Sequence, residues 1–410
     1  MSNTHDPPQE QSQPLCAAPF PPRTPYGAEE LAEVTDALRS QNLFSFGGTK
    51  VKALEQQFAE QYGVRYAYAC TSGTAAIHLA IAALNPEPGS EIITAPVTDF
   101  GTIAGLLFQG CVPIFADWKP GAFNLDPEDI ERKITAKTAA ILPVHLFGNP
   151  CDMDEIIAIA QRHGLPVIED CAQAYCTTHR GRLVGTIGDI GCFSMQQSKH
   201  LATGEGGMVI TGSEDLAMRM ELFRDKGWES RGKWGARAYA FLGLNYRMNE
   251  LTAAVALVQL RKVEAVATAR HERGGQLTRL ISGLPGIHPA PVADGGYHSY
   301  WLYALRVTGR DAEAFAQALI KEGLPCGWGY TVKPIYLCTE ALSAKRTFGT
   351  SGYPFNSQYY GKEIEYRPGL CPVAERELLE TITISLNENW TTADIEDTAR
   401  TISKVAQGRQ

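Results

Sequence analysis

One lysine of this chain stands in a sequence setting that suits covalent chemistry. Lys199 follows the apolar segment Gly191–Ser194 and precedes a glycine-rich turn, Thr203-Gly204-Glu205-Gly206-Gly207. Burial lowers the pKa of a lysine, and the resulting neutral amine can form a Schiff base with an aldehyde. The glycines let the backbone turn tightly and approach a bound molecule closely. Lys199 is therefore a candidate nucleophile, although most lysines beside glycine turns have no such role.

A carboxylate could serve the same centre. Asp170 ends the apolar segment Leu165–Asp170, and in open α/β sheets ligands bind at the carboxyl ends of strands. The alternative role is a helix cap after the strand, which aspartate often fills. Glu169 is the competing carboxylate. Because side chains alternate along a strand, only one of the two faces the site, and we assign Asp170.

An anion site and an aromatic surface also have candidates. Thr71-Ser72-Gly73-Thr74 precede a helix expected over Ala75–Leu84, and the free N–H groups of a helix start bind anions. Plain N-capping is the alternative there. Ser194 could add a hydroxyl. Phe100 follows the strand expected over Glu91–Thr94 and could stack on a ring, or it could pack in the core.

These four kinds of group are what pyridoxal 5'-phosphate requires from a protein. Its aldehyde needs a lysine, its ring nitrogen a carboxylate, its phosphate hydrogen-bond donors and its ring face an aromatic side chain. An ionised Asp170 would keep the ring nitrogen protonated, which makes the ring an electron sink. We therefore predict pyridoxal phosphate as the cofactor.

The overall composition excludes several other classes. The 410 residues carry a formal net charge of −8, so no basic field favours nucleic acid or an anionic membrane. No apolar stretch is long enough to span a bilayer. The ten cysteines are scattered without the spacing of a zinc set, so no metal is predicted. Free cysteines of this kind favour a reduced, cytoplasmic setting.

The elements that must position these residues follow an alternating pattern. From about residue 50 to 215, apolar strand patterns are separated by helical ones, which predicts an α/β fold with a mostly parallel sheet covered by helices. A long helix is expected over Asn249–Leu284, with a possible break at Gly274-Gly275. The predicted organisation is a flexible N-terminal tail over residues 1–26, a large cofactor-binding domain over 27–263 and a smaller α+β domain over 264–410.

The motifs together resemble those of the DegT/DnrJ/StrS family of sugar and cyclitol aminotransferases. The similarity extends from about residue 27 to the C-terminus, with the order and spacing of the motifs intact. The matching segments are Phe46-Gly47-Gly48, Thr71–Ala76, Asp117, Pro143–Gly148, Glu169–Ala174, Phe193 to Lys199 with Glu205-Gly206-Gly207, Leu244–Glu250 and Cys371–Glu375.

The resemblance implies the fold-type I architecture of pyridoxal-phosphate enzymes and assigns roles to residues. Lys199 would form the Schiff base with the cofactor and shuttle the proton, and Asp170 would pair with the ring nitrogen. In this family, the segment that contains Asn245 reaches the phosphate of the neighbouring subunit, which implies a homodimer with shared active sites. The remaining cofactor contacts would come from Gln173 at the 3'-oxygen, Ser72, Gly73, Thr74 and Ser194 at the phosphate, and Phe100 over the ring.

Three further residues are candidates for the substrate pocket. Tyr175 and Asp99 depart from the small residue or histidine and the threonine that this family commonly carries there, and His145 ends an apolar strand within a matched motif. Tyr175 could instead pack in the core, and Asp99 could be a solvated loop carboxylate.

The predicted reaction is ping-pong transfer of an amino group from L-glutamine or L-glutamate to a keto-cyclitol or keto-sugar, in secondary-metabolite or amino-sugar biosynthesis. The segment Ser194-Met195-Gln196-Gln197-Ser198-Lys199 resembles the corresponding segment of cyclitol aminotransferases of the scyllo-inosose type. Nucleotide-sugar and aminohydroxybenzoate-forming relatives stay open as alternatives, and so does a non-catalytic regulator. A nucleotide-linked acceptor would call for basic groups, for which the chain offers Lys226, Arg231, Lys233 and Arg237. A dinucleotide-binding oxidoreductase is disfavoured, because the G-x-G-x-x-G fingerprint is absent.

Overall fold

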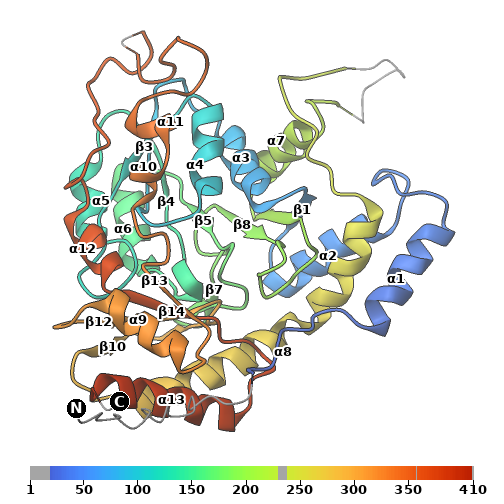
Figure 1. Ribbon diagram of the computed structural model, residues 1–410. Helices are drawn as coiled ribbons and strands as arrows, with labels where there is room; N and C mark the ends of the chain where they lie inside the picture. The colour runs from blue at the N-terminus through green and yellow to red at the C-terminus, as the bar shows by residue number, and fades with distance from the viewer. Residues whose placement is uncertain (1–18, 230–237, 357, 409–410) are drawn as a thin grey trace, which may run out of the picture.

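The protein is an α/β molecule with one large central sheet and helices on both of its faces (Figure 1). The computed structural model describes residues 19–229, 238–356 and 358–408. None of the helices within these ranges is long and apolar enough to cross a membrane.

The central sheet is built from two groups of strands. One group has the order β1 (Tyr66–Cys70), β9 (Gly207–Thr211), β8 (Ile190–Ser194), β5 (Ile168–Asp170), and the other has the order β3 (Val112–Phe115), β2 (Glu91–Thr94), β4 (Thr138–Leu142). Single parallel bridges, Ile141 with Val167 and Val144 with Asp170, join β4 to β5. Strand β9 is antiparallel to both of its neighbours, and the other pairings are parallel. The predicted mostly parallel sheet is confirmed.

Helices cover both faces of this sheet, which explains its continuous apolar strands. Every residue of β2, β8 and β9 is buried, as expected for strands with a helix layer on each side. Helix α3 is itself largely buried, from Ala75 to Ala83. The helices of this part are α1 (Ala28–Arg39), α2 (Lys50–Tyr62), α3 (Gly73–Leu84), α4 (Phe100–Phe108), α5 (Pro127–Lys133), α6 (Met153–His163) and α7 (Glu214–Arg224), with the 3-10 turn η1 (Leu146–Gly148).

A second, antiparallel sheet lies in the C-terminal part of the chain. Its order is β10 (Ile287–Pro289), β12 (Tyr303–Val307), β14 (Thr381–Ile384), β13 (Cys326–Trp328). The small strands β6 (Thr178–His179), β7 (Arg182–Leu183) and β11 (Gly296–Tyr297) form a third sheet. The C-terminal helices are α9 (Ala312–Lys321), α10 (Ile335–Cys338), α11 (Glu340–Ser343), α12 (Pro372–Leu379) and α13 (Thr392–Ala406).

Helix α8 (Glu250–Ile281) links the two parts and lies beside α13 (Figure 1). It continues through the predicted boundary at residues 263 and 264, so the division into two domains stays a prediction. The helix also continues through Gly274-Gly275, where a break was considered. A Cβ atom at Gly274 would lie 2.6 Å from the ring of Tyr300. Glycine therefore allows close packing of this ring rather than ending the helix.

The end of the N-terminal segment is docked on the C-terminal part. The ring of Phe20 stacks on Trp390 with centroids 4.3 Å apart. Asn387 and Asn389 donate hydrogen bonds to the carbonyls of the two prolines that follow, Pro21 and Pro22. We call residues 20–26 the N-terminal strap. The prediction of a flexible tail is wrong for these residues, because apolar stacking and hydrogen bonds to prolines hold them; residues 1–18 lie outside the described ranges.

Candidate active site

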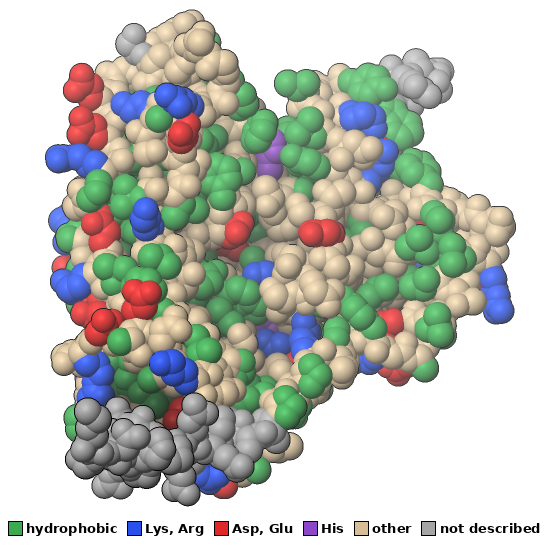
Figure 2. All heavy atoms as spheres, in the orientation of Figure 1, with side chains coloured by type: hydrophobic (Ala, Val, Ile, Leu, Met, Phe, Trp, Pro, Cys, Tyr) green, Lys and Arg blue, Asp and Glu red, His purple; other side chains and the backbone are tan. Residues whose placement is uncertain are grey.

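A cavity of about 340 Å³ lies where the carboxyl ends of β5 and β8 meet the start of α3. Its size is typical of small-molecule sites. In the space-filling view, charged side chains of both signs lie around a hollow near the centre of this face (Figure 2). The cavity brings together most of the predicted residues, namely Ser72, Gly73, Thr74, Asp99, Asp170, Gln173, Ser194 and Lys199.

Lys199 lies in the loop after β8 and is half-buried. Its Nζ atom stands 3.9 Å from the ring centroid of Trp301. Burial lowers the pKa of this lysine to about 8, although the charges of Asp170 and Asp99 oppose the shift. A substantial fraction of the amine is therefore neutral near pH 8, as Schiff-base chemistry requires.

Asp170 is buried at the end of β5 with both carboxylate oxygens in hydrogen bonds. Oδ2 accepts from the Thr102 hydroxyl at 2.8 Å, and Oδ1 accepts from the backbone N–H of Ala172 at 3.0 Å. Burial raises the pKa of Asp170, and these two bonds and the charge of Lys199 oppose that rise. A protonated ring nitrogen in the cavity would supply the counter-charge that this carboxylate lacks.

The start of α3 has the form of an anion site. The Ser72 hydroxyl caps the helix by accepting from the N–H of Ala75 at 3.0 Å, so the capping role considered from the sequence is present. The first turn still leaves N–H groups without intrahelical partners. A Cβ atom at Gly73 would lie 2.7 Å from Cβ of Ser194. Glycine therefore lets β8 and the helix start converge on one point.

Gln173 is fixed from both ends of its amide. Its Oε1 atom accepts from the backbone N–H of Phe147 at 2.7 Å, and its Nε2 atom donates to the Tyr330 hydroxyl at 3.1 Å. Tyr330, Trp301 and Thr102 also line the cavity, and no sequence motif points to any of the three. Each comes from a segment whose spacing carries no chemical signature.

The predicted ring cover is not among the described residues that line the cavity. Phe100 begins α4 and is 36% exposed as a residue, whereas its neighbours Asp99 and Gly101 do line the cavity. Stacking by Phe100 stays a prediction. Asp99 caps α4, because its Oδ1 accepts from the N–H of Gly101 at 2.7 Å.

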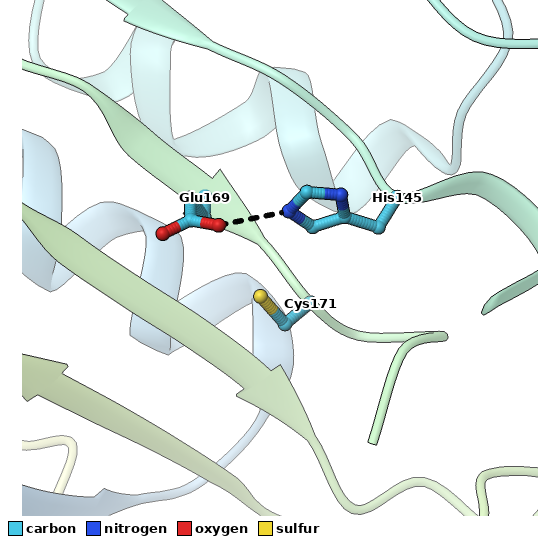
Figure 3. Close-up of side chains that lie close together, drawn as sticks. All are labelled: His145, Glu169 and Cys171. Atoms are coloured by element: carbon cyan, nitrogen blue, oxygen red, sulfur yellow. Dashed lines mark hydrogen bonds and ion pairs between the residues drawn. The ribbon is translucent and has the colours of Figure 1, made fainter. Parts of the chain in front are cut away.

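Two of the three tentative substrate residues lie in the core. His145 is fully buried; its Nε2 atom donates to Glu169 at 3.0 Å and its Nδ1 atom accepts from the N–H of Cys151 at 3.1 Å (Figure 3). Tyr175 is also fully buried and donates to the carbonyl of Ser194 at 3.1 Å. The prediction that these two side chains contact a substrate is therefore corrected: both hold the framework beneath the site.

Asn245 is exposed and pairs through its backbone with Asp225, away from the cavity of its own chain. This position is compatible with the predicted contact to another subunit, which stays a prediction. Among the basic candidates, Lys226 forms an ion pair with Asp225. The other three, Arg231, Lys233 and Arg237, lie outside the described residues.

The cavity fits pyridoxal phosphate by its set of side chains. It holds a lysine with a lowered pKa, a buried carboxylate and an uncovered helix start around one volume. Lys199 would hold the aldehyde carbon, Asp170 the ring nitrogen, and Ser72, Gly73, Thr74 and Ser194 the phosphate. Four further cavities among the described residues do not combine these three groups.

Comparisons with known proteins agree with this chemistry. The chain is 34% identical over 392 residues to the spore coat polysaccharide biosynthesis protein SpsC of Bacillus subtilis, covering 93% of this chain and 95% of that protein. It is 39% identical over 262 residues to the GDP-perosamine synthase of Caulobacter vibrioides, covering 63% of this chain and 70% of the other. A solved aminotransferase from Psychrobacter cryohalolentis superposes with a TM-score of 0.82 at 29% identity, over 95% of this chain and 99% of that one. The sequence pattern of the DegT/DnrJ/EryC1/StrS aminotransferase family matches residues 25–403. The chain therefore belongs to this family and is a pyridoxal-phosphate-dependent aminotransferase.

Proposed function

We propose that this aminotransferase moves an amino group from L-glutamate or L-glutamine to the keto group of a nucleotide-linked sugar. The observation that carries the proposal is the 39% identity, over 262 residues, with an enzyme named for the GDP-linked product GDP-perosamine. We further propose a homodimer in which Asn245 completes the partner's site.

The residues of the cavity have separate tasks in such a reaction. Pyridoxal phosphate, when bound, supplies an aldehyde that receives the amino group and a ring that accepts electrons. Lys199 Nζ removes the proton from the α-carbon of the donor, and in the second half-reaction it delivers a proton to the former keto carbon of the acceptor. Burial lowers the pKa of this amine, which favours the neutral form that can accept a proton.

Other residues fix the reacting groups. Thr102 and the N–H of Ala172 orient the Asp170 carboxylate. Trp301 covers the amine of Lys199 and excludes water from that side, and its ring face also attracts the ammonium form. Such preorganised contacts supply much of the rate enhancement of enzymes, because no group has to be reoriented during the reaction.

One observation favours a second acceptor class. The carboxylate residues Asp99 and Glu205 line the cavity with Asp170, and negative charge repels a diphosphate. An uncharged keto-cyclitol, the acceptor that the sequence of the Lys199 segment predicts, avoids this repulsion. The cyclitol therefore stays as the alternative acceptor.

The test is a set of turnover assays on the purified chain loaded with pyridoxal phosphate. L-glutamate and L-glutamine serve in turn as donors, and a GDP-linked keto-sugar, a keto-cyclitol and an aminohydroxybenzoate precursor serve as acceptors. We expect amination of the GDP-linked sugar by the wild type.

Lys199→Ala is the negative control for these assays. It should lose the visible absorption of the bound cofactor together with turnover, while its melting temperature in the absence of cofactor stays close to that of the wild type. Turnover with the cyclitol alone would replace the proposed acceptor. Turnover by Lys199→Ala would refute the site itself.

A further inference from the structure

The N-terminal strap binds the loop that contains Lys199 through hydrogen bonds from outside the cavity. We propose that Arg23, in this strap, is a positioning residue that fixes the place of Lys199 for the reaction. The inference rests on the assignment of Lys199 above, and it goes beyond the choice of substrates.

The guanidinium of Arg23 spans three backbone carbonyls of one loop. Its Nη1 atom donates to the carbonyls of Gln197 at 3.1 Å and Lys199 at 2.5 Å, and its Nη2 atom donates to that of His200 at 2.6 Å. The planar fork of an arginine holds several acceptors in a fixed geometry, which the rotating ammonium of a lysine does not. Arg23 therefore fixes the backbone on both sides of the Lys199 side chain.

Arg23 is itself held by a partly buried ion cluster. Its Nε atom donates to Glu388 Oε1 at 2.7 Å, and Arg270 donates to Glu388 Oε2 from Nη2 at 2.8 Å and from Nε at 2.9 Å. Burial alone would raise the pKa of Glu388, but the charges of Arg270 and Arg23 hold that pKa below its usual value. The side chains of Arg23, Glu388 and Arg270 are 14%, 13% and 3% exposed. A charge-assisted cluster with so little water around it has a defined geometry.

The opposite side of the loop is held by Trp301. Its indole N–H donates to the carbonyl of Ser198 at 2.9 Å, and Arg270 donates to the carbonyl of Trp301 at 3.2 Å. Lys199 Nζ lies over the same Trp301 ring, 3.9 Å from its centroid. Arg270 thus connects the two supports, since it contacts both Glu388 and Trp301.

The expected consequence of losing Arg23 follows from these contacts. Three carbonyls lose their donor, so the loop around Lys199 relaxes and Nζ moves away from Trp301. A displacement of about 1 Å at a reacting group can reduce a rate roughly 100-fold. A more hydrated amine also has a higher pKa, so the pH at which Lys199 becomes neutral should rise above about 8.

The experiment compares Arg23→Ala, Arg23→Lys and a matched control, Arg310→Ala, in the full chain loaded with pyridoxal phosphate. Arg310 also donates to two backbone carbonyls, those of Ala406 at 2.7 Å and Pro285 at 3.2 Å, away from the cavity. The readouts are kcat per bound cofactor, the melting temperature and, on the cofactor-free protein, the pH midpoint of the rate at which it captures pyridoxal phosphate.

We expect Arg23→Ala to lower kcat roughly 10- to 100-fold and to raise the pH midpoint, with Arg23→Lys restoring part of both and Arg310→Ala changing neither. An Arg23→Ala enzyme with a lower melting temperature but an unchanged kcat and midpoint would overturn the proposal. If Arg23→Ala fails to fold, Glu388→Gln takes its place. This variant keeps the guanidinium of Arg23 but removes the charge of the carboxylate that holds it. The same shifts on a smaller scale are then expected, and an unchanged midpoint refutes the proposal. A wild type without cofactor absorption or turnover would instead refute the assignment of Lys199.

Discussion

At the scale of single residues, the charge of Asp99 opposes the effect of burial on Lys199 and so reduces the neutral fraction of its amine. Asp99 and Asp170 both raise the pKa of this lysine against the effect of burial. Asp99→Asn keeps an oxygen that can accept from the N–H of Gly101 and so preserves the cap of α4, but it removes the charge. The pKa of Lys199 should therefore fall below about 8.

The measurement is the rate at which the cofactor-free enzyme captures pyridoxal phosphate as a function of pH. Since the neutral amine is the reactive form, the midpoint of this profile should move to lower pH in Asp99→Asn. A midpoint that stays in place would show that Asp99 is screened by solvent and has no effect on the lysine.

Sequence reasoning reached the residues of the site that carry a local signature. Lys199 stands before its glycine turn, Asp170 ends a strand and Ser72 opens a helix, and the cavity brings these side chains together. For His145 and Tyr175 the prediction was wrong, because a motif does not show whether a side chain points into the cavity or into the core. Sequence reasoning also missed Trp301, because only the tertiary fold brings this residue beside a lysine far away in the chain.

At the scale of elements, the start of α3 caps its helix and is also the proposed site of the cofactor phosphate. Ser72→Ala removes the cap that accepts from Ala75, which costs about 1 kcal/mol of stability. Ser213→Ala removes the equivalent cap of α7, where Ser213 accepts from the N–H of Leu216 at 3.4 Å. Both variants should unfold at slightly lower temperature. Only Ser72→Ala should also bind pyridoxal phosphate more weakly, as measured by titration of the cofactor-free protein.

The result would be read from the difference between these two variants. Equal cofactor affinities in Ser72→Ala and Ser213→Ala would mean that Ser72 only caps its helix and that the phosphate depends on other donors.

Elements with a strong period were predictable, and elements set by long-range pairing were not. The strand expected over Glu91–Thr94 has those bounds in the structure, and the helix expected over Ala75–Leu84 is present as α3 (Gly73–Leu84). Strand β9 was missed, because its first residue belongs to a glycine run that indicates a turn, and its place between β1 and β8 depends on residues far away. The sequence suggests a helix break at Gly274, but α8 continues through it. The glycine is needed for close packing against the ring of Tyr300, a contact that the sequence does not reveal.

At the scale of the whole molecule, the proposed homodimer predicts complementation between two inactive variants. Lys199→Ala would lack the reacting amine, and Asn245→Ala would lack the proposed contact to the partner's cofactor. In a mixed dimer, one site would lack both groups and the other would be intact. Random reassociation of equal amounts should therefore restore about a quarter of the wild-type activity.

The measurement is activity after the two variants are mixed, dissociated and reassociated. If each site were built from a single chain, every site in the mixture would carry one defect and the activity would stay at the level of the separate variants.

The N-terminal strap has a consequence for the order in which the enzyme matures. Arg23 and Glu388 are 365 residues apart in sequence, yet their contact secures the loop of Lys199. During synthesis the chain emerges from its N-terminus, so the strap and the lysine are both made long before the carboxylate that anchors them. The central sheet can form in the meantime, whereas the lysine loop has to wait for Glu388. A chain that lacks Glu388 should therefore have a less defined lysine loop and react with pyridoxal phosphate more slowly than a chain that contains it.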